Sequence, residues 1–247
     1  MKYAVLSDIH SNIEAFKATV EYAQHLGVEK YWCLGDLIGY GPDPKKCVEF
    51  MRSLPFKAYV GGNHESALLS LDLSNMNKVA SSAIYYTNDQ LSKEELDWIY
   101  NTAYWTQDFG KIAVAHGSYY NPEKFAYLSL YEYERKMNFQ EMQDNQINTL
   151  FVGHTHRPSL MVKNEKGYPV YDDVEFINLK DIGRCAIDVG SVGQPRDKDV
   201  RASFAVYDSD EQTVVRHRVE YDYEKTADKI KKVGLPLRLA ERLKEGK

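Results

Sequence analysis

The sequence has 247 residues, of which 43% are hydrophobic, and its net charge is −5. This length suits one large domain or two small ones, and the apolar content is enough for a sizeable core. Non-specific binding to long nucleic acid needs a basic surface, so the mild negative charge without a long basic stripe argues against it.

Membrane insertion and disulfide bonding are also disfavoured. The apolar runs are shorter than the roughly 18–20 residues of a membrane span, and Met1-Lys2 leads directly into a strand pattern without a signal-peptide pattern. The three cysteines are widely scattered, which favours neither a disulfide framework nor a Cys zinc site. We therefore expect a cytoplasmic protein with no membrane partner.

The first hundred residues alternate between strand and helix patterns. We predict strands at 2–7, 31–34 and 57–60, and helices at 12–26 and 44–54. This order is typical of a parallel α/β sheet. Residues 66–108 are predicted to be mostly helical, with a capping box that begins at Ser92.

The second half is predicted to be mostly β. Two strands, 111–115 and 149–152, enclose the aromatic-rich segment 118–146, which is interpreted as a lid or insert near the active site. It could stack on a base or alcohol, but packing as ordinary core is the simpler interpretation. Further strands are predicted at 159–163, 169–171, 174–179, 184–189, 203–207 and 213–219, followed by an amphipathic tail from Tyr223. No linker divides the chain, so residues 1–247 are expected to form a single domain.

Five of the seven histidines follow short apolar runs, beside Asp, Asn or Gly; they are His10, His64, His116, His154 and His156. Side chains two residues apart in an extended segment point the same way, so His154 and His156 can reach one small volume. Two such histidines alone would more often be solvated loop residues. The distribution of all five is explained most simply by a shared metal site.

Each candidate ligand follows the carboxyl end of a predicted strand, where α/β sheets gather their ligand sites. The set contains Asp8, His10, Asp36, Asn63, His64, His116, His154 and His156. Singly, these residues could be helix caps, turn formers or loop histidines. Together they offer carboxylate, imidazole and amide groups without sulfur, which suits Mn²⁺, Fe, Zn²⁺ or Ni²⁺. Seven of these eight residues, taken as ligands, are too many for one tetrahedral ion but suit two ions that share a carboxylate.

Five short motifs carry a family resemblance. They resemble, in order, the motifs of the calcineurin-like metallophosphoesterases. The motifs are Asp8-Ile9-His10, Gly35-Asp36-Leu37-Ile38-Gly39, Gly62-Asn63-His64-Glu65, His116-Gly117 and Gly153-His154-Thr155-His156. The resemblance extends to a small prokaryotic subgroup, described only as phosphoesterases, through the segments 39–44, 190–196 and 234–243. One departure is Ser11, which stands where many members have Gly.

The resemblance implies an α/β (α+β) fold, a four-layer αββα sandwich of two mixed β-sheets flanked by helices. It also implies a dinuclear centre of two divalent transition-metal ions, with Mn the first choice. Carried over by position, Asp8, His10 and His156 would bind one ion, and Asn63, His116 and His154 the other, with Asp36 as the bridge.

The chemistry of phosphoester cleavage suits this set, because two cations neutralise the phosphate and lower the pKa of a bridging water to give hydroxide. His64 is the one motif histidine without a metal role, so it is expected to be the general acid. Its alternative role is a hydrogen bond that only orients the substrate. Arg196 is expected to contact a phosphate oxygen, with a structural ion pair as the alternative, and Tyr40 is expected to line the pocket.

The expected function is metal-dependent hydrolysis of a small phosphodiester or nucleotide phosphoanhydride, for example a dinucleoside polyphosphate. One alternative is a phosphomonoesterase or phosphoprotein phosphatase, which would need an open groove. Another is a non-catalytic metal-binding interaction module, although such members typically lose the acid histidine or a ligand, and here all are present. The substrate, the native metal and the oligomeric state, a homodimer included, stay open.

Overall fold

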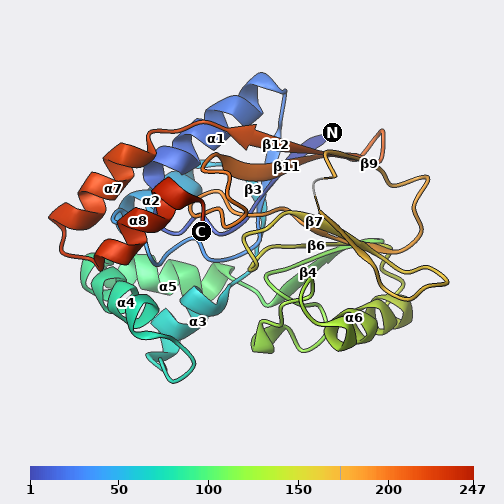
Figure 1. Ribbon diagram of the computed structural model, residues 1–247, viewed down its shortest axis with the longest axis horizontal. Helices are drawn as coiled ribbons and strands as arrows, with labels where there is room; N and C mark the ends of the chain where they lie inside the picture. The colour runs from blue at the N-terminus through green and yellow to red at the C-terminus, as the bar shows by residue number, and fades with distance from the viewer. Residues whose placement is uncertain (173) are drawn as a thin grey trace.

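Residues 1–172 and 174–247 are described by the computed structural model, and they form two six-stranded β-sheets between layers of helices (Figure 1). The strand order is β3-β2-β1-β11-β12-β9 in the first sheet and β4-β5-β6-β10-β7-β8 in the second. The strands are β1 (Lys2–Leu6), β2 (Lys30–Cys33), β3 (Phe56–Tyr59), β4 (Thr106–Phe109), β5 (Ile112–Ala115), β6 (Thr149–Val152), β7 (Ser159–Val162), β8 (Val170–Asp172), β9 (Phe176–Asn178), β10 (Cys185–Asp188), β11 (Ala202–Asp208) and β12 (Thr213–Val219). This architecture confirms the predicted αββα sandwich.

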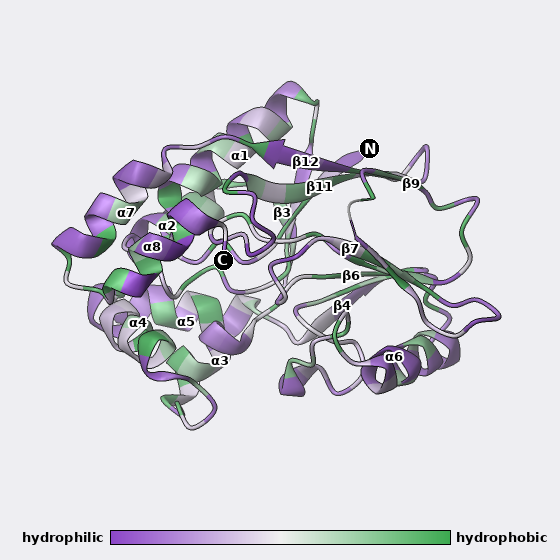
Figure 2. Cartoon of the chain, viewed as in Figure 1, coloured by the Kyte–Doolittle hydropathy of each residue, from purple (hydrophilic) through white to green (hydrophobic). Residues whose placement is uncertain are grey.

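The helices cover the outer faces of the two sheets. They are α1 (Ile13–His25), α2 (Pro44–Ser53), α3 (Asn63–Ser70), α4 (Lys78–Gln90), α5 (Lys93–Thr102), α6 (Glu132–Asp144), α7 (Tyr223–Lys232) and α8 (Leu237–Glu245). In Figure 2 purple and green residues lie side by side on the same helices, as expected where one face packs on a sheet and the other meets solvent. None of the described helices has the length and apolar content to cross a membrane.

Both sheets are mixed, which refines the expectation of a parallel sheet. Strands β1, β2 and β3 are parallel because α1 and α2 cross over between them, and β11, β12 and β9 then add antiparallel strands. In the second sheet β6 lies between β5 and β10 and pairs with both in the parallel direction. The five motif-bearing strands are therefore divided, three in one sheet and two in the other.

The prediction of a mostly helical segment over 66–108 is wrong at its end. Residues Thr106–Phe109 form β4, which pairs antiparallel with β5 from Phe109↔Ile112 to Thr106↔Ala115. The connecting Gly110 has φ +68°, a left-handed conformation that glycine adopts without strain and that suits a tight hairpin. The glycine turn and the pairing edge of β5 thus override local helical preference. The predicted Ser92 cap is present, with its hydroxyl accepting from the Glu95 N–H.

Aromatic side chains join the two sheets. Trp32 of β2 stacks on Phe109 with a ring-centroid distance of 5.1 Å and contacts Phe151 of β6 at 5.8 Å. Phe151 is fully buried, and it also meets Tyr207 of β11 at 5.8 Å. Since these rings come from both sheets, their burial fixes the distance between the strand ends that carry the candidate ligands.

Replacing Phe151 with alanine tests this junction. Phe151→Ala removes a buried aromatic ring and leaves a cavity, so the free energy of unfolding should fall by about 3–5 kcal/mol. The measurement is urea denaturation of the metal-free protein. Phe176→Ala is the matched control, because Phe176 on β9 is 59% exposed, and it should change stability by less than about 0.5 kcal/mol. Equal losses in the two variants would contradict the assignment of Phe151 to the junction.

Candidate metal centre

The predicted ligands lie in the loops that follow β1, β2, β3, β5 and β6, where the carboxyl ends of the two sheets meet. Hydrogen bonds tie these loops together across the sandwich. The N–H of His154, after β6, donates to Asp8 Oδ2, after β1, at 2.9 Å. The N–H of Asp8 in turn donates to Gly35 O at 3.0 Å. Strand ends from separate sheets are thereby held as one site.

The ligand-bearing loops adopt a backbone conformation that is rare for residues other than glycine. Asp8, His10, Asp36, His154 and His156 all have φ between 48° and 69°. Each such residue costs of order 1 kcal/mol or more, and such residues gather at functional sites where the surrounding structure enforces them. The strain directs several side chains inward from short loops.

The first cluster contains Asp8, His10 and His156, all buried. His156 Nε2 lies 3.2 Å from Asp8 Oδ1 and 3.1 Å from His10 Nε2. The opposite nitrogens of the two rings face carbonyl oxygens, with His156 Nδ1 2.6 Å from Gln194 O and His10 Nδ1 3.2 Å from Ile38 O. Since a carbonyl can only accept, both Nδ1 atoms carry the proton, and two Nε2 lone pairs face each other.

The second cluster contains Asp36, His116 and His154, also buried. His116 Nδ1 donates to Leu34 O at 2.7 Å, so its Nε2 is the nitrogen that faces the cluster, 3.1 Å from His154 Nδ1. Asp36 Oδ2 is 3.3 Å from His116 Nε2 and 3.6 Å from His10 Nε2, so it lies between the two clusters. This is the position that a bridging carboxylate requires.

These donor atoms fit divalent cations better than they fit one another. Asp8 Oδ1 and Asn63 Oδ1 are buried and accept no hydrogen bond, although buried polar atoms normally have partners. A cation would satisfy these oxygens and the facing nitrogen lone pairs together. Burial alone would raise the pKa of the Asp8 and Asp36 carboxyls. The neighbouring histidines lower it by more than burial raises it, so both carboxyls are ionised. In the metal-free protein burial opposes the charge on His116, but Asp36 outweighs it and raises the pKa of His116 to about 10.

His64 lies beside both clusters without belonging to either. The backbone N–H of His64 donates to Asp36 Oδ1 at 2.9 Å, and the ring Nε2 lies 4.0 Å from Asp36 Oδ2. The ring contacts His10 at 4.8 Å and Tyr40 at 4.4 Å between centroids. His64 could also ligate an ion together with His10 and Asp36. However, His10 already belongs to the first cluster and Asp36 to the second. A Cβ at Gly39, where φ is +90°, would clash with His64 Nδ1, so this position requires glycine.

Two supporting residues were not predicted. The Glu65 carboxylate accepts from the N–H groups of Gly62 at 2.7 Å, Asp36 at 2.8 Å and Ile38 at 3.2 Å, so it ties the loop after β2 to the start of α3. It stands three residues after Gly62, the position at which a glutamate can accept from the N-cap N–H, and this spacing is visible in the sequence. Gln194, whose carbonyl oxygen orients His156, acts through its backbone and left no such signal.

The aromatic segment 118–146 divides into two parts. The Tyr127 ring stacks on His154 with centroids 4.1 Å apart, and Phe125 contacts His116 at 5.9 Å. Residues of α6, among them Phe139 and Met142, instead pack as ordinary core on the second sheet. The loop thus forms an aromatic wall beside the second cluster, while the helix has the structural role.

Arg196 and Tyr40 lie on the other side of the centre. The Arg196 guanidinium is 5.7 Å from the centroid of the Tyr40 ring, and it donates to Gln194 Oε1 at 2.9 Å. Tyr40 contacts His10 at 4.6 Å. Within the described residues Arg196 has no carboxylate at ion-pair distance, so the alternative of a structural ion pair receives no support.

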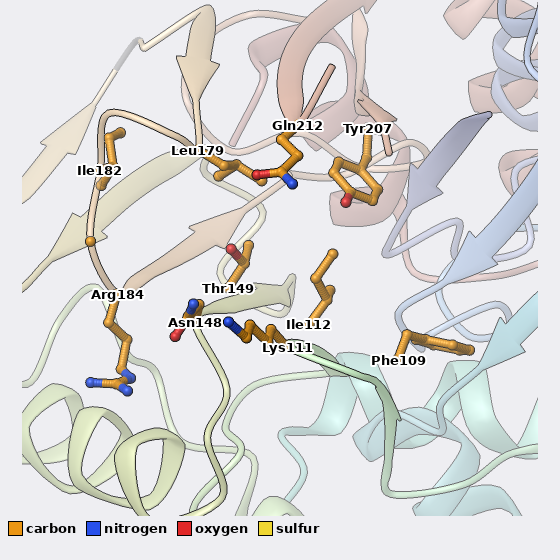
Figure 3. A pocket seen from close by; sticks show the side chains of 11 residues that line it. Phe109, Lys111, Ile112, Asn148, Thr149, Leu179, Ile182, Arg184, Tyr207 and Gln212 are labelled. Carbon is orange, nitrogen blue, oxygen red and sulfur yellow. The ribbon is translucent and has the colours of Figure 1, made fainter. Parts of the chain in front are cut away.

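A separate hollow opens at the opposite end of the sandwich (Figure 3). Its lining includes Ile112 and Thr149, which begin β5 and β6, and the side chains of Lys111, Asn148 and Tyr207. The described residues that line it include no carboxylate, histidine or cysteine. It lies a full strand length from the ligands, so the metal centre is the candidate for chemistry.

Ser11 provides a test of the loop strain. Its φ is +51° and its buried hydroxyl has no partner, which explains why glycine is favourable after the first histidine. Ser11→Gly should raise the free energy of unfolding by about 1 kcal/mol, as measured by urea denaturation. Ser11→Ala removes the hydroxyl but keeps the strained backbone, so it should stabilise less. A larger gain from alanine would show that the hydroxyl, and not the backbone, is unfavourable.

A second test uses pH and the metal-free protein. Burial, assisted by His116, lowers the pKa of His154 to about 3, below the ordinary value of about 6.5 in an unfolded chain. Between these values the unfolded chain binds the extra proton, so stability falls as the pH decreases below about 6.5. From pH 7 to pH 5.5 the wild-type protein should lose about 1 kcal/mol more than His154→Gln. Identical pH dependence in urea denaturation would rule out this role of His154.

Comparison with known proteins agrees with the geometry. A protein of Methanocaldococcus jannaschii, described as uncharacterized, is 34% identical over 244 residues, which cover 97% of this chain and 96% of that protein. The crystal structure of a metallophosphoesterase from Sphaerobacter thermophilus matches with a TM-score of 0.85 and 35% identity, covering 100% of this chain and 99% of that one. A hypothetical protein from Pyrococcus horikoshii shares the fold, with a TM-score of 0.80, 21% identity and coverage of 100% and 98%. The family model of the calcineurin-like phosphoesterase superfamily domain matches residues 1–212, and the chain therefore belongs to this superfamily.

Proposed function

We propose that this protein hydrolyses a small phosphodiester or nucleotide phosphoanhydride with the help of two divalent transition-metal ions. The observation that carries the proposal is the pair of buried clusters that meet at Asp36, in each of which all ligand atoms lie within 4.8 Å of one another. Imidazole nitrogens and carboxylate oxygens gathered in this way, with Asp8 Oδ1 and Asn63 Oδ1 left without hydrogen-bond partners, are suited to two adjacent cations.

The ligand assignment is the one that the family resemblance implies, and the two clusters support it. Asp8, His10 and His156 would hold one ion, Asn63, His116 and His154 the other, and Asp36 both. When bound, the ions neutralise the phosphate charge and make water a nucleophile near neutral pH. Carboxylate, amide and imidazole donors without sulfur favour Mn²⁺, and the same set also suits Fe, Zn²⁺ and Ni²⁺.

The remaining residues bind the substrate and move a proton. His64 donates its proton to the leaving oxygen as the bond between that oxygen and phosphorus breaks. Burial lowers the pKa of His64 to about 4 although Asp36 raises it, and an anionic phosphate bound beside the ring would raise it further. Asn63 and Arg196 can donate hydrogen bonds to phosphate oxygens, with Tyr40 as the wall of the pocket.

The proposed setting is the cytoplasm, with a small phosphoester or nucleotide as the only partner that the site requires. The three cysteines, Cys33, Cys47 and Cys185, are free and buried, which fits a reducing compartment. The net charge of −5 suits a compact anionic substrate held by local cations better than a long nucleic acid.

Hydrolysis of bis(4-nitrophenyl) phosphate, beside 4-nitrophenyl phosphate, tests the proposal. Metal-stripped protein should be inactive, and Mn²⁺ should restore cleavage of the diester. His64→Ala should lower kcat by about 10²–10⁴-fold while two ions remain bound, since it removes the proton donor and no ligand. Asp36→Asn should lower both activity and metal content. Product release is followed by absorbance and bound metal by elemental analysis.

His25→Ala is the matched control, because His25 is an exposed histidine at the end of α1, and this variant should behave as the wild type. Preference for the monoester would replace the proposal with a phosphomonoesterase or phosphoprotein phosphatase. If two ions bind and neither ester is cut, the protein is better described as a metal-binding interaction module.

A further inference from the structure

The C-terminal helix α8 extends to the edge of the metal centre. It packs against α7 and buries Leu239, Ala240 and Leu243. A small cavity between α8 and the centre is lined by Leu243 on one side and by His10 and Tyr40 on the other. Only this narrow space therefore separates α8 from the first cluster.

Arg242 lies on α8 and meets the centre through Tyr40. Its guanidinium lies near the Tyr40 hydroxyl, and its Nε is buried without a hydrogen-bond partner. Burial lowers the pKa of Arg242, and the charge of nearby Arg196 lowers it further. Both guanidiniums thus lie beside the Tyr40 ring, that of Arg196 over its face and that of Arg242 near its hydroxyl.

Neither guanidinium is neutralised within the part of the chain that the structure describes, because no carboxylate lies at ion-pair distance from Arg196 or Arg242. Some other arginines are paired with carboxylates. Arg238, one turn earlier on α8, contacts Glu241 and Glu245, and Arg201 contacts Asp199. Two adjacent, partly buried like charges are unfavourable unless an anion joins them. The pair is therefore arranged for an anionic ligand.

We propose that Arg242 and Arg196 bind a second phosphoryl group next to the scissile one, so that the substrate class is a phosphoanhydride, such as a nucleoside polyphosphate. This inference rests on the proposed function and narrows it. Planar guanidiniums with several donors match phosphate oxygens well. An aryl or alkyl diester has no second anion to place there.

The position of Arg196 indicates which side of the scissile phosphate the second group occupies. Arg196 is close enough to His64 and His156 for its charge to act on both rings. His64 is the proposed donor to the leaving oxygen, so the guanidiniums lie on the leaving-group side. In the reaction a water oxygen bonds to phosphorus, and the bond from phosphorus to the bridging oxygen breaks. The electron pair stays on that oxygen, which takes the His64 proton, while the water proton passes to solvent and His64 is later reprotonated from solvent.

The test compares two probes with the Mn²⁺-loaded full-length protein: diadenosine tetraphosphate as the phosphoanhydride and bis(4-nitrophenyl) phosphate as the diester. Arg242→Ala should lower the ratio of kcat/KM for the anhydride to that for the diester by about ten- to hundredfold, the effect of losing a charged hydrogen bond. Arg242→Lys keeps the charge and should recover part of the ratio. Calorimetry with imidodiphosphate gives a readout independent of turnover, and Arg242→Ala should bind it about tenfold more weakly.

Arg238→Ala is the matched control, because Arg238 is on the same helix and pairs with glutamates, and its ratio should equal that of the wild type. If Arg242→Ala lowers both activities equally, or leaves both unchanged, Arg242 has only a structural role and the inference is wrong while the proposed function stands. If the wild type cuts the diester but not the anhydride, the inference is again wrong. If it cuts neither probe, both the inference and the proposed function fail.

Discussion

The structure depends on one electrostatic constraint, the gathering of several imidazole rings and two ionised carboxylates in one buried space. His10 and His156 face each other through Nε2 atoms 3.1 Å apart, and His116 faces His154 at the same distance. Carbonyl oxygens fix the opposite nitrogens of His10, His116 and His156 as donors. Such an arrangement is costly in a metal-free protein, so metal binding and stability should be linked.

Several features of the surrounding fold offset this free-energy cost. Two sheets bring their carboxyl ends together, and aromatic contacts such as Trp32 with Phe151 fix their separation. Glu65 gathers three backbone N–H groups and so holds the Asp36 loop against α3. Left-handed residues in the loops direct the ligands inward. Stability built elsewhere in the sandwich thus maintains a site that is unfavourable by itself.

Much of this organisation could be predicted from the sequence, because strand and helix patterns are local and the ligands follow strand ends. Asp8, Asp36 and His116 could be placed by this rule, since each follows an apolar run within two residues. The distribution of the strands between two sheets could not, because pairing depends on contacts distant in sequence. β4 was missed since its four residues carry little apolar pattern and form a strand only by pairing with β5.

The residues that were harder to predict are those that act through tertiary contacts. Gln194 orients His156 by a backbone carbonyl, which any residue type could supply. Arg242 lies more than eighty residues beyond His156 on an amphipathic helix, where an arginine is ordinarily a solvated surface residue. Only the packing of α8 beside Tyr40 shows that its guanidinium lies near the edge of the centre.

The site is also asymmetric, and this asymmetry has a bearing on specificity. Tyr127 and Phe125 form an aromatic wall beside His154 and His116, whereas Arg196 and Arg242 form a cationic wall beside His10 and His156. A substrate with a planar group at one end and a second phosphate at the other would complement both walls. Both walls come from segments outside the five ligand motifs. The motifs therefore fix the reaction chemistry, while the loop before α6, the segment after β10 and helix α8 are free to determine which phosphoester is bound.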